Sequence, residues 1–324
     1  MLISAVAALT DLAPPALSLR DEVLAGLARP QKAIPPKFFY DARGCELFDA
    51  ICALPEYYPT RTELAIMRAH AGDMAGALGA GCALIEIGCG NGAKTRLLLE
   101  HLQPSAFVPV DIAAEQLEVS CGVLAQAFPG LRIYPVRADF ALPVTLPSAL
   151  APARELRRVL YFPGSTIGNF TREEALVFLQ RWKPVLGAGG ALLIGVDLKK
   201  DAAVLEAAYN DGAGITAAFN LNLLARFNRE LGADFDLGAF RHRAFYDVAL
   251  GRVEMHLESL RAQTVTVAGL RFAFAAGETI HTEISCKYSL EEFAALGTAA
   301  GYAPVRAWKD AADLFSVHCF TTPR

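Results

Sequence analysis

The stretch 83–92 constrains the fold of this chain more than any other. Its first half, Ala83-Leu84-Ile85-Glu86-Ile87, is an apolar run of strand length that stops at the turn Gly88-Cys89-Gly90-Asn91-Gly92. A helix-like pattern follows, and a second short apolar run, 107–110, ends in Asp111. Strand, glycine turn, helix, strand and carboxylate in this order are typical of a doubly wound α/β sheet that binds a nucleoside. We expect Asp111 to accept hydrogen bonds from ribose hydroxyls.

The spacing of the glycines bears on which nucleoside is bound. A dinucleotide fingerprint reads G-x-G-x-x-G and places a pyrophosphate on the helix N-terminus. This chain instead has G-x-G-x-G, with a carboxylate, Glu86, inside the preceding strand. That pattern suits S-adenosylmethionine (SAM), which carries no phosphate and ends in a zwitterionic amino acid. The motif alone leaves three hypotheses open: SAM, a dinucleotide, or a turn that only connects strand to helix.

Composition points to a globular protein with a small-molecule partner. The 324 residues are enough for one large domain or two ordinary ones, and 53% of them are hydrophobic. The formal net charge is −4, and no run of Lys or Arg interrupts the chain, so a nucleic-acid surface is not expected.

Cysteine usage and the apolar runs favour a cytoplasmic location. Seven scattered cysteines form no C-x-x-C pair, so reduced, mostly buried thiols are expected rather than disulfides or a zinc site. The N-terminus lacks the basic region of a signal peptide, and no apolar run reaches the ~18–20 residues of a membrane span.

Strand and helix patterns alternate from about 61 to 196. Further strands are expected at 131–136, 158–162 and 191–196, and a capping box at Thr171 opens a helix through about Val185. Such alternation indicates a parallel sheet with helices on both faces. Ligands of such sheets bind at the carboxyl ends of the strands, where Gly88, Asp111, Asp139 and Asn169 occur.

The pattern changes after about residue 197. The stretch 202–231 reads as helical with a break near 212–214, and 252–260 and 263–267 alternate as antiparallel strands with one exposed face. A capped helix from Ser289 and a strand at 314–320 should return to the first sheet. We therefore expect a domain of 61–196 plus 287–324 and a second, α+β domain of 1–60 plus 197–286.

Several polar and aromatic segments leave more than one interpretation open. Tyr57 and Tyr58 lie between prolines and could close a domain junction by packing or present a polar tip to a ligand. Glu283 and Ser285 share one face of a strand, which periodicity cannot assign to the interior or to solvent. His256 and His281 show no metal-ligand spacing, so no metal site is expected.

Eight motifs in fixed order carry a family resemblance. They are FFYDARGCELFDAI, LPEYYPTRTE, EIGCGNGAKTR, FPGSTIGNF, YNDGAGITAAFN, FNRELGADFDL, RVEMHL and TEISCKY, and together they run from about residue 20 to the C-terminus. The chain resembles the histidine-specific, SAM-dependent methyltransferases, whose best-known members make hercynine, Nα,Nα,Nα-trimethylhistidine, for ergothioneine biosynthesis. The resemblance implies a Rossmann-like SAM domain and a second, α+β domain, built from the N-terminus and an insertion, that selects the amino acid.

The resemblance also implies a role for individual residues. SAM would be held by Gly88, Lys94 and Asp111, with Asp139 and Phe140 at the adenine. The amino-acid end of L-histidine would be held by Tyr57, Asn169 and Tyr209, and its imidazole would be recognised by Glu283 and Ser285. Tyr40 would lie near the amine, and Thr216 and Met255 would line the pocket. The chain departs from the family pattern at Asn91-Gly92-Ala93, which leaves contacts with the methionine end of SAM undefined.

These roles agree with the chemistry of the side chains. Lys94 could pair with the SAM carboxylate, and an ionised Glu283 would accept a hydrogen bond from the imidazole. Tyr40 could accept or relay the amine proton. Two alternatives stay open: methylation of another aromatic or modified amino acid, and a non-catalytic SAM or amino-acid sensor. A nicotinamide oxidoreductase lacks support because the third glycine is misplaced, and a monomer is expected.

Overall fold

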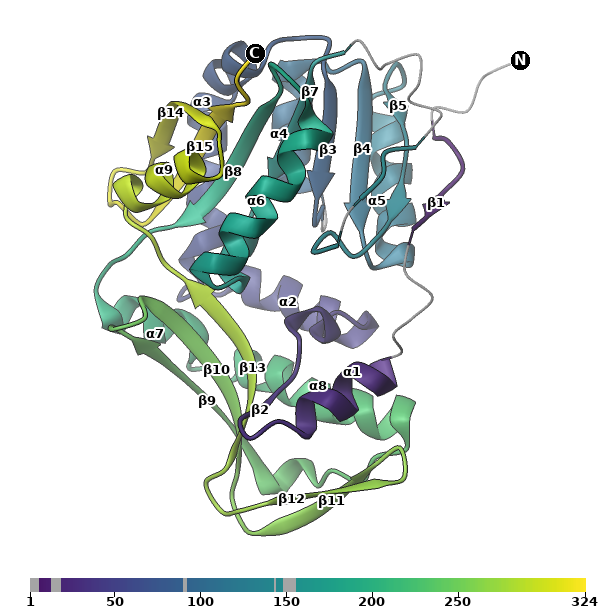
Figure 1. The fold of residues 1–324 in the computed structure, drawn as a ribbon, viewed down its shortest axis with the longest axis vertical. Coiled ribbons are helices and arrows are strands. Elements are labelled where there is room, and N and C mark those ends of the chain that lie inside the picture. The colour runs from purple at the N-terminus through teal and green to yellow at the C-terminus, as the bar shows by residue number, and fades with distance from the viewer. Residues whose placement is uncertain (1–5, 13–18, 90–91, 143, 148–155) are drawn as a thin grey trace. The chain divides into compact units, whose positions relative to one another are not determined.

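The computed structural model describes residues 6–12, 19–89, 92–142, 144–147 and 156–324, which form two compact units (Figure 1). Unit 1 comprises Met1–Pro14, Pro59–Lys199 and Tyr288–Arg324, and unit 2 comprises Pro15–Tyr58 and Lys200–Lys287. No helix among the described residues is long and apolar enough to cross a membrane.

Unit 1 is built on a nine-stranded sheet. The order is β1-β6-β4-β3-β7-β8-β15-β14, and β5 also pairs with β4. The strands are β1 (Thr10–Asp11), β3 (Ala83–Ile87), β4 (Ala106–Asp111), β5 (Arg132–Ile133), β6 (Val136–Arg137), β7 (Arg158–Phe162), β8 (Ala191–Asp197), β14 (Ala303–Lys309) and β15 (Phe315–Thr321). The strands from β1 to β8 pair in parallel, whereas β15 pairs antiparallel with β8 and with β14. The predicted return of the C-terminal strand to this sheet is confirmed.

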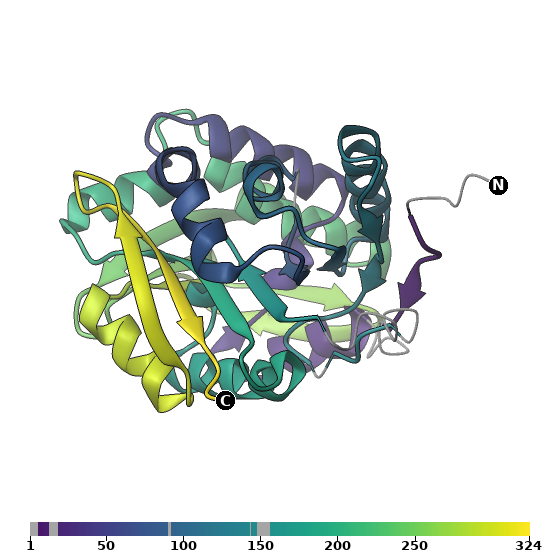
Figure 2. The same cartoon turned by 90° about the horizontal axis from the view of Figure 1, so that it is seen from above.

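Helices cover both faces of this sheet. They are α3 (Tyr58–Leu78), α4 (Ala93–Leu102), α5 (Ala114–Ala127), α6 (Arg172–Leu186) and α9 (Leu290–Ala299). Figure 2 shows the blue helices α4 and α5 on one face and the teal α6 and yellow-green α9 on the other. The central strands are buried: β3 and β8 at every position and β7 at all but its first, because both faces of a doubly wound sheet lie inside the protein.

Local sequence explains where these helices begin. Thr171 accepts a hydrogen bond from Glu174 N at 3.2 Å while the Glu174 carboxylate accepts from Thr171 N at 2.8 Å, so the predicted capping box is confirmed. A second capping box opens α9 at Ser289. At the end of β3, Gly88 has φ of 71°, a left-handed conformation that favours glycine.

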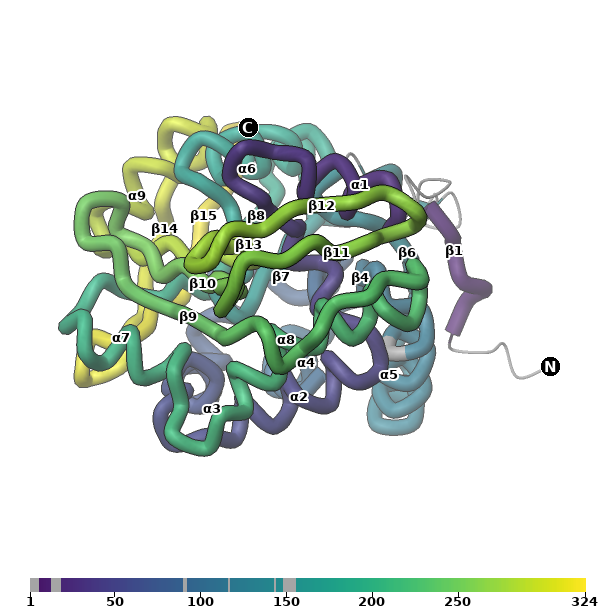
Figure 3. Tube along the Cα trace, turned by 90° about the horizontal axis from the view of Figure 1, so that it is seen from below, coloured from purple at the N-terminus to yellow at the C-terminus, as the bar shows by residue number. Residues whose placement is uncertain are grey.

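Unit 2 contains a four-stranded sheet of order β2-β13-β10-β9 and a separate hairpin, β11-β12. The strands are β2 (Lys32–Ala33), β9 (Phe240–Asp247), β10 (Arg252–Ser259), β11 (Gln263–Val267), β12 (Leu270–Phe274) and β13 (Thr279–Cys286). The helices are α1 (Leu19–Leu27), α2 (Ala42–Ala53), α7 (Ala202–Tyr209) and α8 (Ile215–Leu231), with short 3-10 turns η1 (Pro36–Phe39) and η4 (Leu237–Ala239). Figure 3 traces the green strands and the hairpin of this unit. The predicted helix break falls between α7 and α8.

Three expectations need correction. The strand expected at 131–136 is two short strands, β5 and β6, on either side of Pro135, which cannot donate a ladder hydrogen bond. Thr10–Asp11 pairs with Val136–Arg137, so this N-terminal segment extends the sheet of unit 1 rather than joining unit 2.

The third correction concerns β10, which lacks the exposed face that its alternation predicted. Glu254, His256 and Glu258 are each less than 10% exposed. They tolerate burial because they pair with one another or with arginines: Glu254 binds His256 and Arg252, and Glu258 binds Arg241.

Candidate functional site

The carboxyl edge of the parallel strands in unit 1 gathers the residues expected to bind SAM. Gly88 follows β3 and Asp111 ends β4, and their strands are neighbours: Gly88 N donates to Val110 O at 3.0 Å. Asp139 and Phe140 follow β6, and Asn169 ends the 3-10 turn η3 (Thr166–Asn169) after β7. β3 lies between β4 and β7, where chain connections run in opposite directions, the position at which such sheets bind ligands.

Asp111 is the carboxylate of this edge with the most defined setting. Its Oδ1 accepts a hydrogen bond from Ala113 N at 3.0 Å, and its Oδ2 lies 3.9 Å from the Cys89 sulfur. Burial raises the pKa of Asp111 above its usual value, although backbone N–H groups oppose the shift. A partly desolvated carboxylate at a strand end is a suitable acceptor for a diol such as ribose.

Phe140 supplies an aromatic surface at the same edge. Its ring meets Phe162 edge-on at 5.7 Å and Phe178 at 6.5 Å between centroids. Asp139 Oδ1 accepts a hydrogen bond from Ala141 N at 3.0 Å, which fixes the turn after β6. An aromatic ring held beside a turn carboxylate fits the flat, polar-edged adenine.

Lys94 is already paired with an acid that sequence reasoning missed. Its ammonium lies 2.5 Å from Oε2 of Glu63, a fully buried residue of α3. The Glu63 carboxylate also accepts from Gly164 N, at 2.9 and 3.1 Å to its two oxygens. Because an ammonium has three donors, Lys94 can hold Glu63 and still bind a second carboxylate, such as that of SAM.

Glu86, the acid inside β3, is also held internally. Both of its oxygens lie 2.7 Å from Thr95 Oγ1, and burial raises its pKa to about 8. Glu86 is therefore mostly protonated at neutral pH and carries little charge toward a ligand.

In unit 2, the three tyrosines expected at the amine and amino-acid end belong to one aromatic cluster. Tyr40 packs edge-on against Phe48 at 5.6 Å, and Tyr57 packs edge-on against Phe48 and Tyr209 at 6.3 Å each. Burial raises the pKa of Tyr57 well above its ordinary value. The Tyr57 phenol therefore stays neutral and acts as a hydrogen-bonding group on a packed apolar wall.

The strand β13 presents its polar residues with a period of two. Glu283, Ser285 and Lys287 occupy alternate positions at its end, and the last two contact each other: Lys287 Nζ lies 2.7 Å from Ser285 Oγ. Met255 is the cross-strand partner of Glu283, and its side chain is buried. Among the residues that the structure describes, none donates a hydrogen bond to the Glu283 carboxylate, which leaves it available to a ligand.

The charge expected on Glu283 needs correction. The sequence predicts an ionised carboxylate at neutral pH, but burial raises the pKa of Glu283 to about 7, with the Lys287 charge opposing the shift. The group is therefore close to half protonated near neutrality. The pKa is raised because many protein atoms surround the carboxyl group, although the residue as a whole is only partly buried.

Thr216 was expected to line the substrate pocket. It lies in the first turn of α8 and is buried beside the Asp211 carboxylate, which accepts from Thr216 N at 2.8 Å, and its Oγ1 has no partner in strict hydrogen-bonding geometry among the described residues. A buried hydroxyl without a partner is costly unless a ligand or water satisfies it.

A further polar cluster lies on β10 and β13. Met255 pairs with Glu283, but the next residue, His256, pairs with His281, so Thr282 is bulged out of register. The bulge turns His281 to the face of the sheet that carries Glu254 and His256. Each of the three side chains has one nitrogen or oxygen that could bind a metal, and these atoms lie within 4.8 Å of one another. Sequence spacing had given His281 no such neighbours.

The geometry of this cluster suits stacking rather than an ion. The two imidazoles lie 4.6 Å apart and only 11° from parallel, so their in-plane lone pairs do not converge on one point. Their nitrogens also have protein partners: His256 binds Glu254 and Thr279, and His281 binds the carbonyl of Glu283. The expectation of no metal site remains a prediction.

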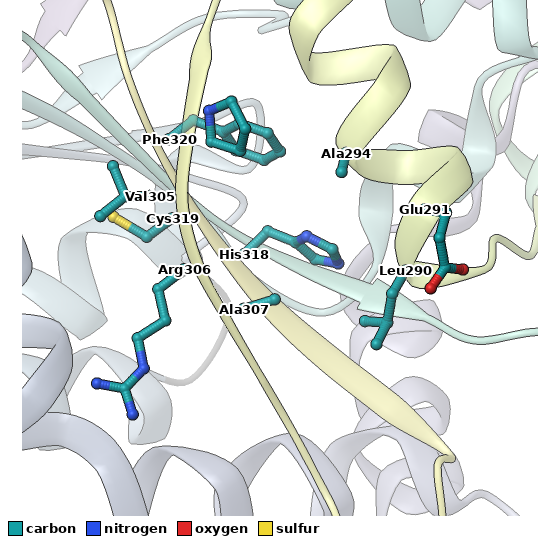
Figure 4. A pocket seen from close by; sticks show the side chains of 10 residues that line it. Leu290, Glu291, Ala294, Val305, Arg306, Ala307, His318, Cys319 and Phe320 are labelled. Atoms are coloured by element: carbon teal, nitrogen blue, oxygen red, sulfur yellow. The ribbon is translucent and has the colours of Figure 1, made fainter.

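A surface pocket of about 290 Å³ lies elsewhere in unit 1 (Figure 4). It is lined by α9, β14 and β15, including Leu290, His318 and Phe320. None of the residues expected to bind SAM or substrate lines it.

Comparisons with known proteins give the chain its relatives. The family described as histidine-specific methyltransferase, SAM-dependent, matches residues 19–322. A histidine N-alpha-methyltransferase of Mycolicibacterium smegmatis is 43% identical over 307 residues, which are 93% of this chain and 94% of that protein.

Two further similarities are more distant. Ergothioneine biosynthesis protein 1 of Neurospora crassa is 33% identical over 304 residues, 90% of this chain and 34% of that protein. The solved structure of a possible exported protein from Bordetella parapertussis aligns with a TM-score of 0.51 at 13% identity, over 94% of this chain and 87% of that one.

Proposed function

Because the chain belongs to the family of histidine-specific, SAM-dependent methyltransferases, we propose that it methylates the α-amine of L-histidine three times and releases hercynine. SAM is the methyl donor and leaves as S-adenosylhomocysteine. The observation that carries the proposal is the end of β13, where Glu283 offers an acceptor and Ser285 lies beside it on the same face. This pair matches the two nitrogens of an imidazole.

We assign SAM binding to residues of unit 1 and most of the histidine binding to residues of unit 2. Unit 1 binds SAM through Gly88, Lys94 and Asp111, with Asp139 and Phe140 at the adenine. Unit 2 binds histidine through Tyr57, Tyr209, Glu283 and Ser285, and Thr216 and Met255 shape the pocket. Asn169 is the further residue that we assign to the amino-acid end of the substrate.

The chemistry rests mainly on positioning. SAM supplies a methyl group on a cationic sulfonium, and the amine lone pair must lie in line behind it. An α-amine has a pKa near ~8, so most of it is protonated at neutral pH and a proton must leave before each transfer. Tyr40, held edge-on by Phe48 and Phe219, orients the amine by hydrogen bonding and relays that proton.

Two alternatives stay open. The chain could be a methyltransferase for another aromatic or modified amino acid, but the pairing of an imidazole with Glu283 and Ser285 argues against this, because an analogue without both nitrogens leaves a buried polar group unpaired. A non-catalytic sensor would not need Tyr40 beside the amine. We further propose that the enzyme is a cytoplasmic monomer and that hercynine feeds ergothioneine biosynthesis, the pathway named for the Neurospora crassa relative.

Mass spectrometry of the purified protein tests the proposal directly. The protein is incubated with SAM and L-histidine, and in parallel with L-tryptophan, L-tyrosine or buffer alone. A gain of three methyl groups on histidine only is the expected result. Methylation of another amino acid would favour the first alternative, and SAM binding without transfer would favour the sensor.

A further inference from the structure

Lys287 is a fully buried lysine at the end of β13, and its ammonium contacts two residues expected to bind substrate. Its Nζ lies 2.7 Å from Ser285 Oγ and 3.2 Å from the hydroxyl oxygen of Tyr209. Nζ also lies 5.0 Å from the centre of the Tyr209 ring. Neither the family motifs nor the charge pattern had given this lysine a role.

Ser285 and Tyr209 also contact each other, so the three polar groups form a closed set of hydrogen bonds. The Tyr209 hydroxyl donates to Ser285 Oγ at 2.8 Å. An ammonium has only donors, so both oxygens must accept from Lys287. Ser285 Oγ then accepts two hydrogen bonds, one from Lys287 and one from Tyr209, which uses both of its lone pairs. Ser285 can therefore still donate its own O–H to a ligand, but it has no lone pair left to accept a hydrogen bond from one.

We propose that Lys287 is a positioning residue that fixes Ser285 as a hydrogen-bond donor, so that the site selects the neutral imidazole of histidine. The unprotonated ring nitrogen accepts from Ser285, and the ring N–H donates to Glu283. This inference rests on the proposed function, since it concerns the way in which the same site reads its substrate.

Electrostatics favours the same selection. An imidazolium has two N–H donors and no acceptor, so one N–H would meet the donating hydroxyl of Ser285. It would also bring a second positive charge close to the buried ammonium of Lys287. A neutral ring satisfies both partners, and Glu283 remains the acid whose charge Lys287 offsets.

A double-mutant cycle tests whether Lys287 acts through Ser285. Lys287→Met keeps the length of the side chain and removes its donors. We expect it to raise KM for L-histidine about 10- to 100-fold, as for loss of a hydrogen bond to a charged group, with kcat and KM for SAM changed much less. Ser285→Ala should raise KM similarly, and the double variant should raise KM by much less than the product of the two single effects, because Lys287 acts largely through Ser285. Effects that multiply would overturn the proposal, because a merely structural lysine acts independently of Ser285.

A measurement on the unmodified protein covers the case in which Lys287→Met does not fold. In 2-fluoro-L-histidine the fluorine keeps the imidazole neutral throughout pH 6 to 8, whereas the ring of histidine, with a pKa near ~6.5, becomes protonated. The ratio of KM for histidine to KM for the fluorinated analogue cancels titration of Glu283, Lys287, Tyr57 and Tyr209. We expect this ratio to rise about two- to fourfold between pH 8 and pH 6.

The outcomes separate this inference from the proposed function. A ratio that stays flat or falls toward pH 6 would mean that the charged ring also binds, and would overturn the inference while histidine methylation stands. If neither compound is methylated by the unmodified protein, the proposed function itself fails.

Discussion

The Lys94 ammonium and the Glu63 carboxylate form an ion pair of 2.5 Å, in which the acid is fully buried and the lysine is about 20% exposed. Gly164 N donates to the same carboxylate, so Glu63 ties the start of α4 to the turn after β7. Gly195 makes room for it, because a Cβ added there would lie 2.2 Å from Glu63 Oε1. This pair positions the lysine that we assign to the SAM carboxylate.

Glu63→Gln should therefore weaken SAM binding as well as the fold. An amide keeps the shape but removes the charge opposite Lys94, which costs about 1–3 kcal/mol of unfolding free energy for a pair of this burial. We expect KM for SAM to rise about tenfold or more while KM for L-histidine changes little. Thermal unfolding and SAM titration by calorimetry measure the two effects.

Gly195→Ala is a matched test that displaces the Glu63 carboxylate without changing its charge. It presses mainly on this carboxylate, since the added Cβ would lie 2.2 Å from Glu63 Oε1 and 3.1 Å from Phe315 Cε1. A loss of SAM affinity parallel to that of Glu63→Gln is expected, and an unaltered affinity in both variants would show that the pair does not position Lys94 for SAM.

Asp111→Asn should reduce SAM affinity without unfolding the sheet. The substitution keeps an acceptor for Ala113 N but loses the charge that we assign to the ribose hydroxyls. Loss of a charged hydrogen bond predicts a rise of about 10- to 100-fold in the Kd for SAM. Asp139→Asn serves as the comparison, since its carboxylate is expected at the adenine, where a smaller effect follows. Equal and small effects would place the ribose elsewhere.

Much of unit 1 follows from local sequence. β3, β4, β7 and β8 are largely apolar runs that stop at a glycine, a proline or an acid, and such runs identify buried parallel strands without any three-dimensional knowledge. The capping box at Thr171 is likewise local. The pair of Glu63 with Lys94 joins residues 31 positions apart on two helices, so only the folded chain brings them together.

Unit 2 shows why periodicity has limits. The alternation Glu283, Ser285, Lys287 could have assigned Lys287 to the face of its neighbours, because these positions differ by two. Periodicity fails at His281, since the bulge at Thr282 reverses the face on which every earlier residue of β13 points. The charge of Glu283 depends on the number of protein atoms that surround it, which no sequence pattern reports.

Tyr40→Phe tests the residue closest to the reaction. Phenylalanine keeps the edge-on contacts with Phe48 and Phe219 and removes only the hydroxyl. If the hydroxyl orients the amine and relays its proton, kcat should fall about 100-fold. Single-turnover mass spectrometry reads each methylation separately. An unchanged rate of trimethylation would remove Tyr40 from the catalytic residues.

The stacked histidines should make the protein less stable in acid. Burial lowers the pKa of His256, and burial together with the neighbouring His256 lowers the pKa of His281. A histidine kept neutral in the folded state destabilises it as pH falls below ~6.5, because the unfolded chain takes up a proton that the folded chain refuses. His281→Gln should reduce the loss of unfolding free energy between pH 7 and pH 5, measured by urea titration. An equal loss in both proteins would assign the acid sensitivity to other groups.

Glu283 should set the acid limit of histidine binding. Because burial raises its pKa to about 7, the carboxylate takes up a proton as pH falls through 7 and can no longer accept from the imidazole N–H with full charge. KM for L-histidine should therefore rise toward pH 6, and Glu283→Gln should have a high KM at pH 8 that changes less with pH.

The raised pKa of Glu283 has the opposite effect on stability. A raised carboxyl pKa favours the folded state at low pH, and this contribution is lost as pH rises from ~4.5 through about 7. Glu283→Gln should accordingly be more stable than the unmodified protein at pH 8 and nearly equal to it at pH 5, as urea titrations at the two pH values measure. If Glu283→Gln lost the same stability at pH 5 and at pH 8, the result would contradict a carboxyl pKa that burial raises to about 7.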